Sequence, residues 1–119
     1  MKPLRLSGRM LAQRNRLIDY REMQACARCG AEIWNNGSRH HRKLRSRGGG
    51  DEVSNGVLLC GSGTTGCHGW AHANPAAATL LGFIVPSTAD PARVPILHAL
   101  YGWVLLNDEG TAVECAPPD

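Results

Sequence analysis

The sequence has no apolar stretch long enough to cross a bilayer. A membrane-spanning helix needs roughly 18 to 20 apolar residues, and even residues 76–86 are interrupted by Thr79, Gly82 and Pro86. The N-terminus also lacks the uninterrupted apolar core of a signal peptide. We therefore expect a protein of the reducing cytoplasm with no membrane partner, whose five cysteines are free thiols or metal ligands rather than disulfides.

Acidic residues are scarce in the first part of the chain. Residues 1–50 contain 3 Asp/Glu against 12 Lys/Arg, whereas residues 51–119 contain 7 against 1. The net charge of +3 therefore hides a basic and an acidic part. Five positive charges fall within residues 39–47: Arg39, Arg42, Lys43, Arg45 and Arg47. This density favours nucleic acid as a partner, with phosphate contacts from these five residues, although a solvated basic loop would have the same composition.

A chain of 119 residues has room for one domain with a modest core. No internal repeat is visible. The apolar spacing predicts a basic amphipathic helix over 9–24, strands over 38–42 and 57–60 around a surface loop at 44–52, and helices over 65–73 and 76–81. Asn74 should cap the last of these helices and Gly82 should end it. Residues 96–101 are weakly helical, and 103–106 should belong to a closing β-hairpin. We expect an α+β fold.

Four of the cysteines form two pairs that suit a structural zinc site. Cys26 and Cys29 have the x2 spacing of a zinc knuckle, and Cys60 and Cys67 follow with six intervening residues. Four thiolates could close a tetrahedral Zn²⁺ site, which would supplement a small core. A rival arrangement joins the first pair to His68 and His72. The fifth cysteine, Cys115, is expected to be a free thiol.

The order of histidines and asparagine carries a family resemblance. His40 and His41 are adjacent on a predicted strand, Asn55 follows fourteen residues after His41, and His68 directly follows Cys67. Over residues 26–72, with the cysteine pairs, this pattern resembles the HNH endonucleases. The stretch 66–75, with a later Asp90-Pro91, looks like the small HNH proteins of actinobacterial phages.

The resemblance implies a ββα-metal core at 26–73, between a basic helix at 1–25 and an extension at 74–119. It also implies metal-dependent hydrolysis of DNA to 5′-phosphate and 3′-hydroxyl ends. His41 would be the general base, His40 a metal ligand, and Asn55 a bridge between backbone groups. His68 and His72 lie four apart on one helix face and could share a divalent ion with His40: Mg²⁺, Mn²⁺, Co²⁺, Ni²⁺ or Zn²⁺. Successive side chains of a strand point to opposite faces, so His40 and His41 should have different roles. This alternation does not say which histidine has which role.

Simpler interpretations exist for several of these residues. His68 and His72 would also suit a polar helix face without metal, and Asn55 before Gly56 is typical of a turn. Trp70 is expected in the core and His98 in a structural role. Two other functions stay open: a zinc module that binds DNA without cleaving it, and an RNase or toxin-type nuclease. By resemblance, the setting is a phage or prophage, with the terminase as a possible partner.

Overall fold

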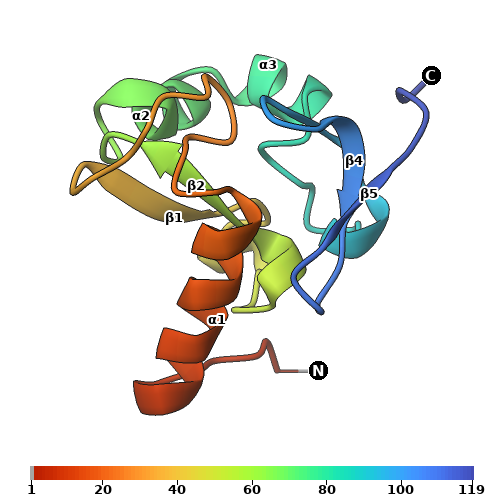
Figure 1. The fold of residues 1–119 in the computed structure, drawn as a ribbon. Coiled ribbons are helices and arrows are strands. Elements are labelled where there is room, and N and C mark those ends of the chain that lie inside the picture. The colour runs from red at the N-terminus through yellow and green to blue at the C-terminus, as the bar shows by residue number, and fades with distance from the viewer. Residues whose placement is uncertain (1) are drawn as a thin grey trace.

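The fold, taken from a computed structural model, is described for residues 2–119. These residues form three α-helices and two small antiparallel sheets (Figure 1), which confirms the α+β class. The helices are α1 (Gly8–Arg21), α2 (Gly66–Ala73) and α3 (Pro75–Leu80). One sheet pairs β1 (Gly37–His41) with β2 (Gly56–Cys60), and the other has the order β3 (Ile96–His98), β4 (Gly102–Leu106), β5 (Ala112–Glu114). No helix within residues 2–119 has both the length and the apolar character to cross a membrane.

Helix α1 packs against the hairpin β1–β2 through Ile18, which is fully buried beside Leu58. It ends at Arg21, three residues earlier than predicted, because Met23 and Gln24 adopt positive φ values that are incompatible with a continuing helix. Two of its basic residues, Arg14 and Arg21, are buried rather than on a solvated side. Part of the predicted basic face of this helix therefore belongs to the interior.

The hairpin β1–β2 and helix α2 lie where the sequence predicts them. In the hairpin, His40 pairs with Val57 and His41 with Gly56. Strand β2 is buried as far as Leu59, in keeping with its continuous apolar run. Helix α2 follows within six residues, so two strands and a helix stand together at one end of the molecule (Figure 1). At the end of α3, Gly82 has a positive φ, and an added Cβ would lie 2.1 Å from the Pro95 oxygen, so glycine is required there.

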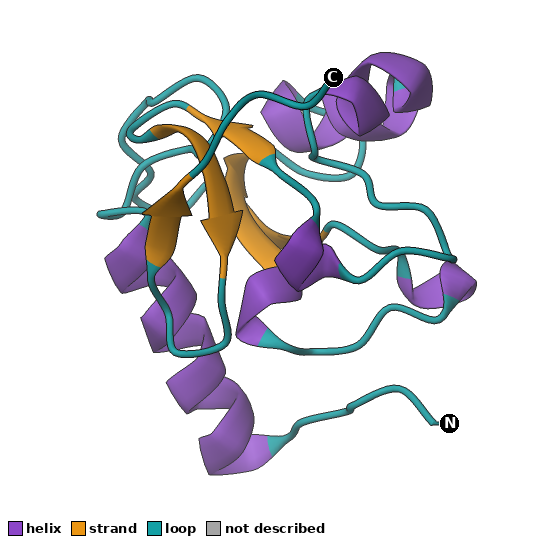
Figure 2. Ribbon diagram, turned by 90° about the vertical axis from the view of Figure 1, so that its right-hand side faces the viewer, coloured by secondary structure: helices purple, strands orange, loops and turns teal. Residues whose placement is uncertain are grey.

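The segment 96–101 corrects the sequence prediction. It contains strand β3 and a turn instead of a weak helix. Ile96 pairs with Val104, and the side chains alternate along the strand, with Ile96 buried and Leu97 exposed. The predicted hairpin is thus extended to three strands, which face the viewer in Figure 2. His98 is buried and its Nε2 lies 2.9 Å from the Glu22 carboxylate, which confirms its structural role.

The main core lies between the two sheets and the α2–α3 pair. It is formed by buried side chains from every one of these elements, among them Val57, Leu59, Ala71, Phe83, Ile96 and Val104. Trp70 packs against this core with its ring edge toward Phe83, as predicted, instead of standing free on the surface. The core fixes α2 against the hairpin, and this contact positions the side chains described next.

Candidate metal centres and active site

Four cysteine side chains meet where the chain leaves α1, ends β2 and begins α2. The sulfur atoms of Cys26, Cys29, Cys60 and Cys67 all lie within 4.8 Å of one another. The Sγ atoms of Cys29 and Cys60 are 3.9 Å apart, close to the roughly 3.8 Å that separates thiolates on a tetrahedral zinc ion with Zn–S bonds of about 2.3 Å. The four thiols could therefore hold a zinc ion, as the sequence predicted.

Glycines allow the long spacing between the second pair of cysteines. Gly61 and Gly66 both have positive φ values. A Cβ on Gly61 would lie 2.1 Å from the Thr65 oxygen, and one on Gly66 would lie 2.6 Å from the Cys60 oxygen. The loop thus folds back on itself more tightly than larger residues permit. The rival arrangement of Cys26 and Cys29 with two histidines is wrong, because those histidines gather elsewhere.

Arg28 supports the cysteine cluster from the surface. Its Nη1 lies 3.4 Å from the Cys67 sulfur, and its guanidinium stacks 3.6 Å above the centre of the Trp70 ring. Burial raises the pKa of the Cys67 thiol to about 12, although Arg28 acts in the opposite direction. A cation at the centre of the cluster is what would ionise such a buried thiol, since metal coordination deprotonates it outright.

Three imidazoles form a second cluster on the other side of the same helix start. His40 comes from β1, and His68 and His72 come from α2. One ligand nitrogen from each lies within 4.8 Å of the others, and the ring centres are 4.8 to 5.4 Å apart. The Nε2 atoms of His68 and His72 are 3.1 Å apart, a separation that suits two nitrogens bound to one cation at about 2.1 Å each.

His40 is oriented by the backbone after α3. Its Nε2 lies 2.7 Å from the Phe83 oxygen, and because a carbonyl only accepts, Nε2 carries the proton. Nδ1 is then the nitrogen left for a cation, in the manner of metal-bound histidines that donate their other N–H to a carbonyl. Burial lowers the pKa of His40 to about 4, so that the ring is neutral, the form that binds metals.

His68 has an unsatisfied ring nitrogen. Its Nδ1 is buried and has no hydrogen-bond partner within residues 2–119. Burial, with a smaller contribution from His72, lowers the pKa of His68 as well. A bound ion in this cluster would be held through the Nε2 atoms of His68 and His72, which already face each other. The donor set therefore fits a divalent metal.

His41, at the end of β1, is held by a carboxylate that the sequence did not single out. Its Nε2 lies 2.8 Å from Asp51 Oδ1, while Oδ2 accepts a hydrogen bond from the Leu6 backbone at 2.9 Å. Burial opposes ionisation of Asp51, but the hydrogen bonds from His41 and Leu6 prevail and keep its pKa below the usual value. The ionised carboxylate fixes the proton on Nε2 of His41, so Nδ1 is left as an acceptor.

The predicted surface loop 44–52 is only partly on the surface. Residues 45–47 are exposed, whereas Gly49, Gly50 and Asp51 are buried. A Cβ on Gly49 would lie 1.7 Å from the Lys43 oxygen, so the turn that returns Asp51 to His41 needs glycine. The acidic pair Asp51-Glu52, directly after three glycines at the end of a basic segment, was the available signal for Asp51.

Asn55 bridges backbone groups, as the resemblance implied. Its Oδ1 accepts from the Lys43 N–H at 2.7 Å, and its Nδ2 donates to the oxygens of Lys43 at 3.1 Å and Gly50 at 2.9 Å. The side chain is fully buried. It therefore ties the start of the 43–51 loop to its end, and with it the place of Asp51.

The prediction that Arg42 contacts phosphate is wrong. Its side chain is completely buried and donates four hydrogen bonds to the backbone oxygens of Gly82, Ser54, Pro91 and Val94. A guanidinium used in this way joins the hairpin to the C-terminal part and cannot reach a ligand. Local charge density does not reveal this, because the acceptors lie 12 to 52 residues away in the sequence.

The other basic residues of the 39–47 run lie on or near the surface. Arg39 forms a two-pronged ion pair with Asp19 of α1. The Lys43 ammonium donates to the Ala89 oxygen at 3.2 Å. Arg45 and Arg47 are exposed. Phosphate contacts by these four residues stay a prediction.

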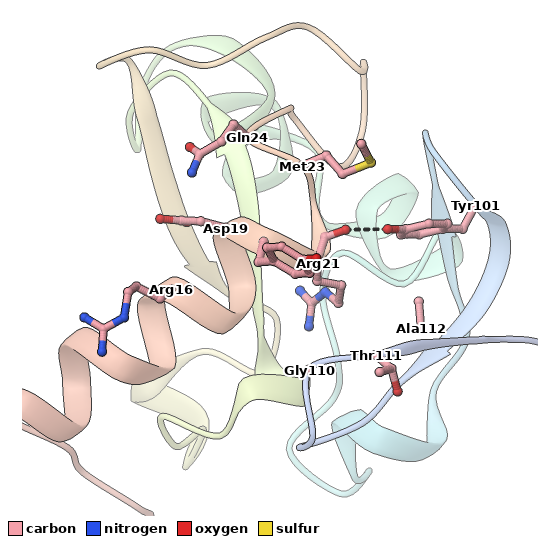
Figure 3. Close-up of a pocket in the computed structure, with 10 residues that line it drawn as sticks. Arg16, Asp19, Arg21, Met23, Gln24, Tyr101, Gly110, Thr111 and Ala112 are labelled. Carbon is pink, nitrogen blue, oxygen red and sulfur yellow. Dashed lines mark hydrogen bonds between the residues drawn. The ribbon is translucent and has the colours of Figure 1, made fainter.

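One cavity brings the four candidate histidines together. It has a volume of about 430 Å³ and is bordered by His40, His41, His68, His72, Arg39 and Arg45. A larger cavity, of about 800 Å³, lies between the end of α1 and the β4–β5 turn, where Figure 3 shows the Tyr101 hydroxyl bonded to the Arg21 oxygen. None of the histidines borders that larger cavity. The smaller cavity is therefore the one that gathers the histidines singled out in the sequence.

Comparison of the chain with protein-family models, with curated proteins and with solved structures finds no match.

Proposed function

We propose that the protein is a metal-dependent endonuclease of the HNH type that hydrolyses phosphodiester bonds of DNA. The observation that carries the proposal is the shared cavity, in which three imidazoles suited to one divalent ion face a fourth, His41, that is tied to a carboxylate. Hydrolysis of a phosphodiester needs a base for water and a cation for the charge that develops on the phosphate. The cavity contains a candidate for each.

His41 is the general base in this proposal. Asp51 holds its proton on Nε2, so Nδ1 can accept the proton of the attacking water. Asp51 then stabilises the imidazolium that forms, and Asn55 keeps the loop with Asp51 in place. Asp51 and Asn55 are positioning residues because they act through His41.

His40, His68 and His72 would hold the divalent ion. When bound, the ion supplies Lewis-acid stabilisation of the phosphate and of the leaving oxygen. Three ligands leave positions for water and phosphate, which is the arrangement of catalytic rather than structural sites. The Phe83 carbonyl, through its hydrogen bond to His40, keeps one of these rings aimed at the cluster.

The polyanion that suits this site is DNA. Arg39 and Arg45 border the cavity, and the surrounding part of the chain is basic. The resemblance adds a setting to the proposal: a phage or prophage enzyme that works with a terminase in DNA packaging. The cysteine cluster would hold a structural zinc ion beside this site.

The test is cleavage of supercoiled plasmid with Mg²⁺, Mn²⁺ or Ni²⁺ by the wild type and by His41→Ala. We expect metal-dependent nicking by the wild type and a loss of about 10² to 10⁴ in rate for the variant, the usual contribution of a general base. The variant should stay folded with the zinc content of the wild type, since His41 belongs to neither ligand cluster.

Two results would redirect the proposal. Intact plasmid under every metal condition, together with tight binding of DNA, favours a zinc module that only binds. Faster cleavage of RNA than of DNA of the same sequence favours a ribonuclease that uses the same residues.

A further inference from the structure

A second cavity adjoins the histidine cavity on the far side of His41. It has a volume of about 410 Å³, and His41, Arg39 and Arg45 border both cavities. Arg5, Arg14, Asn15 and Asp51 complete its polar lining. His41 therefore stands between two hollows, one of which contains the metal ligands while the other contains none.

The second cavity is strongly positive. Four guanidinium groups border it, against the single carboxylate of Asp51, which is already bonded to His41. Arg39 is neutralised by Asp19. Within residues 2–119, however, Arg5 and Arg45 form no ion pair, and both are exposed. Arg14 is likewise in no ion pair among the described residues but is buried, so an anion in this hollow would find two exposed, unpaired charges, on Arg5 and Arg45.

The N-terminal segment builds one wall of this cavity. The Asp51 N–H donates to the Leu4 oxygen at 2.9 Å, the Leu6 N–H donates to Asp51, and Arg5 Nη1 donates to the Gly49 oxygen at 2.7 Å. These contacts hold Arg5 next to the loop that carries Asp51. The Arg5 guanidinium has five N–H donors, so its bond to Gly49 leaves others for a ligand.

We propose that this cavity binds the phosphate next to the scissile one on the same DNA strand. The proposal rests on the proposed function, because the scissile phosphate is assigned to the histidine cavity. Phosphates of one strand follow each other at about 3.4 Å of helix axis, so a strand that places one phosphate at His41 presents its neighbour nearby. The chemical class recognised is a phosphodiester with an adjacent phosphate, and Arg5 and Arg45 are the residues that read it.

The test compares two substrates and three substitutions. Bis(p-nitrophenyl) phosphate has a single phosphate, whereas a duplex oligonucleotide supplies neighbours. Arg5→Gln removes the charge but keeps a donor for Gly49, Arg5→Lys keeps the charge, and Arg16→Gln is the control on α1, outside both cavities. In Arg5→Gln, the ratio of kcat/KM for DNA to that for the small diester should fall about tenfold, as expected for one charged hydrogen bond.

Binding of a fluorescent duplex gives the same information without catalysis. Removal of one phosphate contact in Arg5→Gln should reduce the slope of log Kd against log salt by about 0.9. Arg5→Lys should keep most of the wild-type slope, and Arg16→Gln should keep all of it. An unchanged salt slope and an unchanged substrate ratio in Arg5→Gln would overturn the second phosphate site. Absence of cleavage by the wild type would overturn the proposed function, while the binding data would still decide this inference.

Discussion

The cysteine cluster and the histidine cluster share one helix start but differ in what they leave open. The first has four sulfur donors, enough to fill a tetrahedral ion. The second has three nitrogen donors and borders a cavity of about 430 Å³. A closed set of ligands suits a site that holds the chain together, and an open set suits one that must bind water and substrate. In the proposed function, the chain thus separates stability from chemistry, with the two clusters meeting at the adjacent residues Cys67 and His68.

The largest effect should follow from opening the closed cluster. Cys60→Ser removes one of four sulfur ligands, and because structural zinc contributes folding energy directly, we expect the variant to lose its cooperative thermal transition and its bound zinc. Circular dichroism and metal analysis measure both. Cys115→Ser is the matched control, since Cys115 lies outside the cluster, and it should behave as the wild type. A Cys60→Ser protein that stayed folded without zinc would end the distinction between the two clusters.

Removal of a ligand from the open cluster should leave the fold intact. His72 is exposed, so His72→Ala creates no buried hole. We expect the cleavage rate to fall by more than about a hundredfold, beyond the usual effect of an outer-shell change, with the melting temperature preserved. In cobalt-substituted protein, the charge-transfer bands of the cysteine cluster should persist. Titration with Co²⁺ should show that binding to the histidine cluster is lost. Unfolding of this variant would mean that both clusters are structural.

A smaller effect is expected at Asp51, which acts on the open site through His41. Asp51→Asn can offer an N–H to Nε2, which would reverse the tautomer of the ring. We expect kcat to fall by roughly 10 to 100-fold with KM little changed, and Asp51→Glu to recover part of the loss. Steady-state kinetics on oligonucleotides measure this. A change confined to KM would make Asp51 a part of the binding surface instead.

The smallest effect is expected at Arg28, which contacts the closed cluster at Cys67 and stacks on Trp70 but does not border the histidine cavity. Arg28→Ala removes a charged donor from the Cys67 sulfur and should weaken zinc binding by about tenfold, measured by competition with a chelator. Arg28→Lys should restore part of the affinity. Nuclease activity at saturating zinc should be unaffected. If activity fell in both variants without a matching loss of zinc, Arg28 would be a residue that contacts the substrate.

Short-range patterns in the sequence were enough to single out two pairs of candidate ligands that the structure brings into clusters. The x2 spacing of Cys26 and Cys29 and the four-residue spacing of His68 and His72 reflect local backbone geometry, so both pairs could be read directly. The second hairpin strand followed from the apolar run at 57–60. These features need no knowledge of distant contacts.

Residues that depend on distant contacts escaped prediction. Arg42 has the charge of a phosphate ligand, but carbonyl groups from four remote positions surround it. Asp51 was placed in a solvated loop, because only the folded chain brings it to His41 and Leu6. Strand β3 has little local β preference and exists because β4 offers a partner. In each case tertiary packing outweighs local propensity.

In the proposed function, the carbonyl of Phe83 and three of the four carbonyls that surround Arg42, those of Gly82, Pro91 and Val94, give the C-terminal third a share in the site. All the proposed metal ligands have been synthesised once residue 72 is added, yet the acceptor of His40 follows at residue 83 and the last acceptor of Arg42 at residue 94. A chain truncated after residue 74 would therefore carry all seven ligands without the groups that aim His40 and hold the hairpin. The growing chain therefore contains all the ligands before it contains the carbonyl groups that orient them.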